Sequence, residues 1–375
     1  MIQTNPFTPQ SGLEPKFFSG RDAALRELSS LLEQAQRGSL QHALVLGEWG
    51  VGKTSLFRQF KKMAQEKGLW ACYCGINKVD IKEDIADRLG LIIEEILLGL
   101  PINESRLSLL RAEFNPRKKN ILSAQSELFR FLLAVWKQLN SQSACILLDD
   151  IQNFLPKVEI IDVLRATLSR EDIIKETRFL FVLSSTPEGW NAFLDKHDPI
   201  GRFFRKKLIL EPFTVEETRE FIEGSLQGND VKFSPEVKER IYSYTQGHPY
   251  ELQLLCCHLF DAQKEGRVDL ASWEVALRNT LRDLGRDYFE TLYSKASERE
   301  NALLSILVEK NRPLNLTELR SIMILERKAR SFPIANIKNF IYRLLDKGII
   351  KKSADNSYSV LDPLFREYIS RFKTY

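Results

Sequence analysis

The chain has 375 residues, of which 43% are hydrophobic and 28% are charged, and its formal net charge is +4. This length exceeds a single compact core and suits two or three domains of an ordinary soluble globular protein. The nearly balanced charge gives no argument for nucleic acid binding by the chain as a whole. No uncharged stretch of about 18 residues occurs, which argues against a membrane partner.

Cysteine usage and the N-terminal residues indicate a cytoplasmic protein. The chain has five cysteines and four histidines, and the cysteines lack the spacing of metal ligands. We therefore expect buried, reduced thiols and no zinc site. The first residues lack the basic start and the apolar core of a signal peptide.

Residues 1–20 are rich in proline, glycine and serine, and we expect them to form an extended arm. The arm ends in an aromatic–glycine–arginine segment, Phe17-Phe18-Ser19-Gly20-Arg21, before leucines at helical spacing. Taken alone, this segment is a turn before a helix. Because it lies about 25 residues before a phosphate-binding pattern, it is also a candidate lid over the base of a nucleotide.

The strongest motif follows the apolar run 43–46, which predicts a short buried strand. The next residues fit the pattern G-x-x-x-x-G-K-[ST], and apolar residues then recur at helical spacing until Gly68. Strand, glycine-rich turn and helix are the context in which this pattern indicates phosphate binding rather than a chance glycine turn. The predicted nucleotide-binding residues here are Gly47, Glu48, Trp49, Gly50, Val51, Gly52, Lys53, Thr54 and Ser55.

The residue types in this loop fit that chemistry. Glycines adopt backbone angles that let successive amide N–H groups face one anion, and the helix N-terminus adds its positive end. We expect Lys53 to reach the β- and γ-phosphates and the Thr54 hydroxyl to hold Mg²⁺.

The second chemical landmark is a buried strand that ends in two carboxylates, Cys145-Ile146-Leu147-Leu148-Asp149-Asp150. Ligands of open α/β sheets bind at this end of the strands. We expect Asp149 to hold Mg²⁺, mostly through water, and Asp150 to orient or deprotonate an attacking water. Alone, an apolar run that ends in two aspartates is weak evidence for a metal site. Its position about 95 residues after the phosphate-binding pattern makes this evidence stronger.

Residues 70–74, 179–183 and 208–210 also read as strands, and helical regions such as Lys82–Gly99 lie between the strands. The strand at 179–183 ends in Ser184-Ser185-Thr186, where a polar side chain can touch the γ-phosphate or the water; a simple strand-ending turn is the alternative. The basic segment 115–119 indicates a solvated turn rather than a binding patch. The pattern over residues 43–210 predicts a parallel sheet with helices on both faces.

From Pro212 the pattern is helical. Thr214-Val215-Glu216-Glu217 is a capping box, and Ser234-Pro235 begins another helix. Gly247-His248-Pro249 interrupts the helices before a further one over residues 250–264. We expect His248 to be structural, because one histidine without a partner carries no mechanism.

Residues 286–375 look like a separate unit with 17 Lys and Arg against 11 Asp and Glu, an excess of +6. Three helical patterns, at 300–309, 316–323 and 334–346, precede a hairpin across Asp355-Asn356, which predicts a winged helix-turn-helix. The excess favours a phosphate-facing surface, and the third helix is modestly equipped for base readout. The outward residues that we expect are Asn336, Lys338, Asn339 and Arg343 on this helix and Lys351 and Lys352 on the hairpin.

Together these motifs resemble AAA+/STAND-type P-loop ATPases, and most of all the prokaryotic and archaeal ATPases related to origin-recognition (Orc/Cdc6-like) proteins. The likeness covers nearly the whole chain; the phosphate loop identifies the superfamily, and the order of the later motifs indicates the family. The resemblance implies an α/β fold with sheet order 5-1-4-3-2, a helical lid and a C-terminal winged helix. We expect domains at 1–211, 212–285 and 286–375, with ATP and Mg²⁺ between the core and the lid.

The resemblance also implies roles for single residues. It places Gly20 and Arg21 near the adenine, Ser185 or Thr186 in the sensor position, and Arg202 as an arginine finger that completes the site of a neighbouring subunit. The predicted catalytic residues are Lys53, Asp150, Ser185 and Arg202, and Pro249 joins the predicted nucleotide-binding residues.

Two departures from the family pattern bear on function. The acidic pair usually ends in glutamate, and Asp150 is one methylene shorter, so we expect slow hydrolysis. The Gly247-His248-Pro249 region lacks the arginine that origin-recognition relatives carry in the lid, which favours the signalling branch. The hypotheses are a switch ATPase whose winged helix binds duplex DNA, a STAND-like switch with a protein partner, and a protein that mainly stays loaded with nucleotide.

Overall fold

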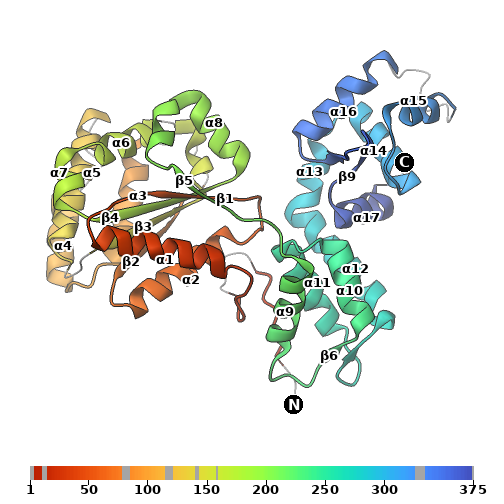
Figure 1. Cartoon of the computed structure of the whole chain (residues 1–375), viewed down its shortest axis with the longest axis horizontal. Helices are drawn as coiled ribbons and strands as arrows, with labels where there is room; N and C mark the ends of the chain where they lie inside the picture. The colour runs from red at the N-terminus through yellow and green to blue at the C-terminus, as the bar shows by residue number, and fades with distance from the viewer. Residues whose placement is uncertain are drawn as a thin grey trace. The chain divides into compact units, whose positions relative to one another are not determined.

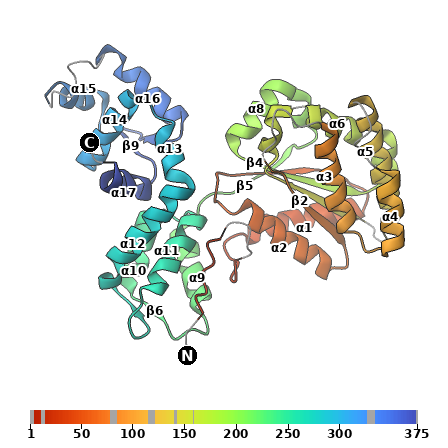
Figure 2. The same cartoon turned by 180° about the vertical axis from the view of Figure 1, so that it is seen from behind.

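The computed structural model describes residues 4–10, 15–77, 85–114, 121–139, 143–157, 159–325 and 334–373. The protein divides into two compact units, which Figures 1 and 2 show from opposite sides. The α/β unit is Phe18–Glu211, and the helical unit combines Met1–Phe17 with Pro212–Tyr375. The α/β unit thus ends where the predicted first domain ends, whereas the residues before Phe18 belong to the helical unit.

Five parallel strands form one sheet in the described part of the α/β unit, in the order β2-β3-β4-β1-β5. This order confirms the predicted 5-1-4-3-2 arrangement. The central strands β1, β3 and β4 are buried along their whole length, which explains their continuous apolar sequences. The strands are β1 (Ala43–Leu46), β2 (Trp70–Gly75), β3 (Ala144–Asp149), β4 (Phe179–Ser185) and β5 (Lys206–Ile209).

Helices cover both faces of this sheet (Figures 1 and 2). Alternate strand residues point to opposite faces, so Val45 packs with α1 (Asp22–Gln36) and α2 (Lys53–Glu66), whereas Leu44 packs in a second cluster. The first residues of the predicted helical region, 82–84, and the predicted turn at 115–119 lie outside the described residues. The second layer consists of α3 (Ile85–Leu98), α4 (Glu104–Glu113), α5 (Ile121–Trp136), α6 (Glu159–Leu168), α7 (Glu171–Glu176) and α8 (Pro187–His197).

The first part of the helical unit begins at the predicted capping box. Thr214 Oγ1 accepts a hydrogen bond from the Glu217 N–H, and the Glu217 carboxylate accepts one from the Thr214 N–H. Ser234 caps the next helix, with Pro235 in its first turn. The elements are α9 (Val215–Leu226), β6 (Lys232–Phe233), α10 (Pro235–Thr245), α11 (Pro249–Asp261), β7 (Arg267–Val268) and α12 (Leu270–Leu284).

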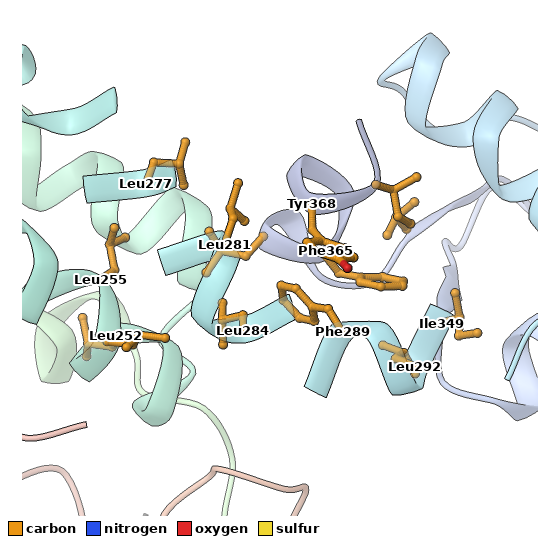
Figure 3. Packing of buried hydrophobic residues seen from close by; sticks show 14 of the residues in the cluster. Leu252, Leu255, Leu277, Leu281, Leu284, Phe289, Leu292, Ile349, Phe365 and Tyr368 are labelled. Carbon is orange, nitrogen blue, oxygen red and sulfur yellow. The ribbon is translucent and has the colours of Figure 1, made fainter. Parts of the chain in front are cut away.

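A π-helical turn, Gly285–Phe289, continues α12 without a break, so the predicted boundary between residues 285 and 286 falls inside one helical stretch. Figure 3 shows the packing at this joint. Leu284 and Phe289 belong to the same buried hydrophobic cluster. The Phe289 ring contacts the rings of Phe365 and Tyr368, with centroid distances of 5.1 and 5.5 Å. One hydrophobic cluster therefore extends across the predicted boundary.

Beyond this joint, the described residues form three longer helices, an antiparallel hairpin and a final helix. Leu314 extends the hairpin by exchanging two backbone hydrogen bonds with Tyr358, and Asn356 adopts φ +61 in the predicted turn. This is the element order predicted for a winged helix-turn-helix, with one further helix, α17, that the sequence pattern does not predict. The elements are α13 (Glu290–Ser294), α14 (Glu298–Lys310), α15 (Leu316–Leu325), α16 (Ile337–Asp346), β8 (Ile350–Lys352), β9 (Tyr358–Val360) and α17 (Pro363–Phe372). Within the described residues, no helix is both long and apolar enough to cross a membrane.

Candidate nucleotide-binding site

The loop between β1 and α2 depends on glycine at two points. A Cβ added to Gly47 would lie 2.6 Å from Val51 Cγ1 and 3.1 Å from the Leu210 carbonyl oxygen, so this position has no room for a side chain. Gly52 precedes α2 with φ +98, in the left-handed region that favours glycine. Val51 is buried and anchors the loop to the core.

Lys53 is the first residue of α2, and its ammonium group lies inside the loop. Its Nζ donates to the carbonyl oxygens of Gly47, at 2.9 Å, and Glu48, at 3.0 Å. Burial lowers the pKa of Lys53, and the charges of Asp150 and Asp149 oppose that shift by favouring the ammonium form. The loop therefore encloses a cation at the place where the motif predicts a phosphate group.

Asp149 ends β3 at the centre of a hydrogen-bond cluster. Among the described residues, its Oδ2 accepts from Thr54 Oγ1 at 2.6 Å and from the Tyr73 hydroxyl at 2.9 Å, and its Oδ1 accepts from the Ser184 hydroxyl. Burial, and then the charge of Asp150, raises the pKa of Asp149, while the three hydroxyl donors oppose this rise.

The Thr54 hydroxyl and the Asp149 carboxylate fit a magnesium ion. Mg²⁺ takes oxygen ligands and retains part of its water shell, so a hydroxyl and one carboxylate beside a phosphate site are a suitable donor set. The two side chains come from α2 and β3 and meet at the carboxyl end of the strands. The fold thus brings together the two predicted metal ligands.

Asp150 directly follows the strand in the left-handed region, with φ +58. Its backbone N–H donates to Ser184 Oγ at 2.8 Å, and its Oδ1 accepts from Gln152 Nε2 at 3.0 Å. Its charge is the largest of the contributions that favour the ammonium form of Lys53. The two acidic residues therefore differ: hydroxyl groups surround the buried Asp149, whereas Asp150 is half-buried and bonded to an amide.

The three polar residues at the end of β4 have different surroundings. Ser184 points to the same face of the sheet as Asp149 and contacts it. Thr186 Oγ1 accepts from the Gly189 N–H at 3.1 Å and so caps α8. The Ser185 Oγ is buried and has no hydrogen-bond partner among the described residues. Ser184 thus joins the Asp149 cluster, and the sensor role of Ser185 or Thr186 toward a nucleotide stays a prediction.

Arg21 connects the segment before α1 to the loop. Its Nη2 donates to the Val51 carbonyl oxygen at 2.9 Å, and the side chain is buried. Gly20, directly before it, has φ +71. The structure therefore places Arg21 against the phosphate loop; contact of Gly20 and Arg21 with an adenine stays a prediction.

The other predicted residues occupy separate positions. Trp49 in the loop is 41% exposed, and Ser55 is half-buried in the first turn of α2. Arg202 is exposed at the end of the 3₁₀ helix η3 (Asp198–Arg202). Pro249 is the first residue of α11, in the helical unit. Their roles toward a nucleotide or a neighbouring subunit stay predictions.

Tyr73, Gln152 and Glu188 belong to this site although no sequence motif includes them. Tyr73 and Gln152 bond to the acidic pair. Burial, and then the charge of Glu188, raises the pKa of Glu48 in the loop. Of these three residues, only Tyr73 could have been suspected from the sequence. It lies near the end of a predicted strand, where alternate side chains point to one face of the sheet.

Comparison with known proteins identifies a matching family and solved structures with a similar fold. Residues 18–181 match the family described as AAA ATPase domain. Over 339 residues the chain is 20% identical to an uncharacterised HTH-type transcriptional regulator of Methanocaldococcus jannaschii, covering 85% of this chain and 81% of the relative. The fold is similar to the Aeropyrum pernix ORC2 protein in its ADPNP–ADP complexes, with a TM-score of 0.66 at 16% identity over 96% of each chain. The A. pernix ORC1 protein in complex with DNA has a TM-score of 0.52 at 17% identity, over 97% of this chain and 96% of that one.

The site lies within the part of the chain that matches the family, because the loop, Thr54 and Asp149 all fall between residues 18 and 181. The similarity to the solved structures extends over nearly the whole chain and shows a shared fold. Residues 18–181 therefore resemble an AAA ATPase domain, and the chain shares its fold with the A. pernix origin-recognition proteins.

Proposed function

We propose that the protein is a nucleotide-switched ATPase that binds ATP and Mg²⁺ at the loop between β1 and α2. The observation that carries this proposal is the contact of Thr54 with Asp149, at 2.6 Å, beside the buried Lys53 ammonium. A hydroxyl, a carboxylate and an ammonium group placed around a glycine-rich loop are the groups that a magnesium–nucleotide complex requires.

Each residue has a defined task in this proposal. Lys53 and the loop N–H groups neutralise and orient the phosphates, and Thr54 and Asp149 hold Mg²⁺, partly through water. When bound, Mg²⁺ neutralises charge on the phosphate oxygens. Asp150 orients the attacking water or accepts its proton. Ser184 fixes both acidic residues, because it donates to the Asp149 carboxylate and accepts from the Asp150 N–H.

Slow hydrolysis is part of the proposal. Asp150 is one methylene shorter than the glutamate usual at this position, and its Oδ1 already accepts from Gln152. A carboxylate oxygen that holds an amide donor is less available to a water proton. The bound nucleotide therefore persists long enough to define a state of the protein.

The proposed output is duplex DNA binding by the part of the helical unit from α14 to β9. The apolar face of α16 is buried, and basic residues are exposed on β8. A polar helix face suits the major groove, and a basic hairpin suits phosphates. The relative named as an HTH-type regulator and the ORC1 complex with DNA support this output. The exposed residues include Asn336, Lys338, Asn339, Tyr342, Arg343, Lys351 and Lys352.

A STAND-like switch with a protein partner is the second candidate, and the turn around Gly247 supports it. Gly247 has φ +76, and a Cβ added there would lie 1.9 Å from the Phe213 carbonyl oxygen. The Phe213 N–H donates to the Gly247 carbonyl oxygen at 2.9 Å. The Gly-x-Pro turn is thus fixed to the segment that enters the helical unit, and Pro249 begins α11.

Self-association is a further element of the proposal. Arg202 is exposed at the end of η3, as an arginine that acts on the nucleotide of a neighbouring subunit must be. The proposed assembly is a homo-oligomer in which Arg202 of one copy completes the site of the next.

The full chain tests this function in two measurements. Titration calorimetry with ATP should give strong binding in Mg²⁺ and weaker binding in EDTA, and phosphate release should report slow turnover. Fluorescence anisotropy of a labelled duplex should differ between ATP, ADP and no nucleotide. A chain that binds no ATP would overturn the ATPase proposal. Nucleotide-independent DNA affinity, or co-purification of a protein with no DNA binding, would move the conclusion to the second candidate.

A further inference from the structure

Tyr73 reaches the metal-binding carboxylate from a neighbouring strand. In the β2–β3 register Gly75 lies opposite Asp149, so Tyr73 is two residues behind that pair and its side chain extends forward along β2. Its hydroxyl donates to Asp149 Oδ2 at 2.9 Å, the oxygen that also accepts from Thr54. Tyr73 is thus in direct contact with one of the two metal ligands.

The space for this contact is built into the strand. A Cβ added to Gly75 would lie 3.3 Å from the Tyr73 hydroxyl oxygen and 3.5 Å from its Cε1, which is tight packing against the end of the ring. Arg58 of α2 lies over the same ring, 5.5 Å from its centroid. Glycine ahead of the ring and a cation above it hold the Tyr73 side chain along the strand.

The hydroxyl donors leave Asp149 little freedom to rotate. An ionised carboxylate accepts about four hydrogen bonds, and among the described residues three hydroxyls already donate to this one. These hydroxyls come from three elements: α2 through Thr54, β2 through Tyr73 and β4 through Ser184. Donors from three directions fix the plane of the carboxylate before a metal ion arrives.

A fixed carboxylate discriminates between metal ions. Mg²⁺ demands near-ideal octahedral geometry at about 2.0–2.1 Å, whereas Ca²⁺ accepts longer and more variable distances. We propose that Tyr73 is a positioning residue that holds Asp149 in the orientation suited to Mg²⁺ and so sets the preference of the nucleotide site for Mg²⁺ over Ca²⁺. This inference rests on the proposed binding of ATP and Mg²⁺ at the loop.

The test is titration calorimetry of the full chain with ADPNP, a non-hydrolysable ATP analogue, in EDTA, in Mg²⁺ and in Ca²⁺. Tyr73→Phe removes only the hydroxyl. We expect the affinity of this variant for ADPNP in EDTA to equal that of the wild type. The increase in affinity that Mg²⁺ gives should fall about tenfold, because the lost hydrogen bond is to a charged group. The increase that Ca²⁺ gives should change less. Tyr244→Phe is the matched control, because Tyr244 packs against Trp273 in the helical unit.

Gly75→Ala is an independent variant that keeps the hydroxyl but pushes it from its place, and it should shift the Mg²⁺/Ca²⁺ ratio in the same direction. An unchanged ratio in both variants, with a wild type that gains affinity in Mg²⁺, would overturn the role of Tyr73 and leave the proposed function intact. A wild type that binds the analogue but gains nothing from Mg²⁺, or that binds none, would overturn both. If Tyr73→Phe does not fold, the Gly75→Ala ratio decides.

Discussion

At the scale of single residues, the buried ammonium of Lys53 joins two loop carbonyl oxygens and supplies the positive charge for phosphates. We expect Lys53→Ala to abolish ATP binding or turnover, because no other group in the loop replaces this charge. The two lost hydrogen bonds should lower the melting temperature by only a few degrees, as each is worth about 1 kcal/mol. Calorimetry checks the affinity and circular dichroism the folding. Lys62→Ala, on the exposed side of the same helix, is the control; equal ATP affinity in Lys53→Ala and wild type would contradict the assigned role.

The two acidic residues should separate in a pair of amide variants. Asp149→Asn replaces a carboxylate oxygen that accepts from hydroxyls by an amide group, so Mg²⁺-dependent binding should weaken at least tenfold. Asp150→Asn should retain ATP affinity and lose hydrolysis, because among the described residues the Asp150 carboxylate bonds to Gln152 and not to a predicted metal ligand. The measurements are calorimetry in Mg²⁺ and EDTA and single-turnover phosphate release. Turnover by Asp150→Asn at the wild-type rate would assign the water to another carboxylate, and Glu188 is a candidate because its charge raises the pKa of Glu48 in the loop.

At the scale of elements, His42 makes the junction of β1 and β4 sensitive to acid. Its ring is buried against Phe181 and Phe204, its Nδ1 accepts from the Phe181 N–H, and burial lowers the pKa of His42 to about 4. The unfolded chain binds a proton near pH 6.5 that the folded chain does not bind until about pH 4. The contribution of neutral His42 to the free energy of unfolding is therefore complete above pH 6.5. This contribution is lost as the pH falls toward 4, and the free energy of unfolding decreases by about 2 kcal/mol between pH 6.5 and 5.

Hydrogen exchange of the β1 and β4 amides in the full chain measures this effect. Protection at pH 5 should be lower than at pH 7.5 after correction for the intrinsic exchange rate. His42→Gln keeps a hydrogen-bond acceptor without a titrating ring, so its protection should depend less on pH. An identical pH dependence in the variant and the wild type would assign the acid sensitivity to other groups.

The elements themselves were largely predictable, because buried parallel strands appear as continuous apolar runs and helices begin at recognisable caps. β1, β2, β3 and β4 lie within a few residues of their predicted ranges. The direction of side chains was harder to predict than the elements. Ser184 and Ser185 are both serines at the end of β4, and they point to opposite faces of the sheet, so only one of them contacts Asp149. Tyr73 was missed for a related reason, since its contact depends on the register between β2 and β3. The position of Tyr73 near a strand end is visible in the sequence, but the register between the two strands is not.

At the scale of the whole molecule, the exposed Arg202 predicts that activity depends on assembly. If one copy completes the site of the next, turnover per subunit should rise with protein concentration, and Arg202→Ala should flatten that rise. Arg205→Ala, at another exposed arginine just beyond η3, is the matched control. Sedimentation measured over the same concentrations reports the oligomeric state. Concentration-independent turnover in a monomer would leave Arg202 as a surface cation.

The DNA-binding proposal makes a quantitative prediction about salt. Lys351 and Lys352 are exposed on β8, where a wing would contact phosphates, and each phosphate contact releases counterions from the duplex. Removing either lysine should therefore reduce the slope of log affinity against log salt by about one unit without changing sequence preference. Lys338 and Arg343 lie on the exposed side of α16, and one should face a base edge and the other a phosphate. Substitution of the residue that faces the base should also change which sequences bind.

The measurement is fluorescence anisotropy of the full chain with a labelled duplex at several salt concentrations, in the presence of ATP. Lys295→Ala removes an exposed lysine outside α16 and the hairpin, so its slope should equal that of the wild type. A slope unchanged by both Lys351→Ala and Lys352→Ala would remove the wing from the DNA interface. Absence of binding near 50 mM salt would instead identify this part of the helical unit as a protein-contact module, because electrostatic attraction to DNA is strong at low salt.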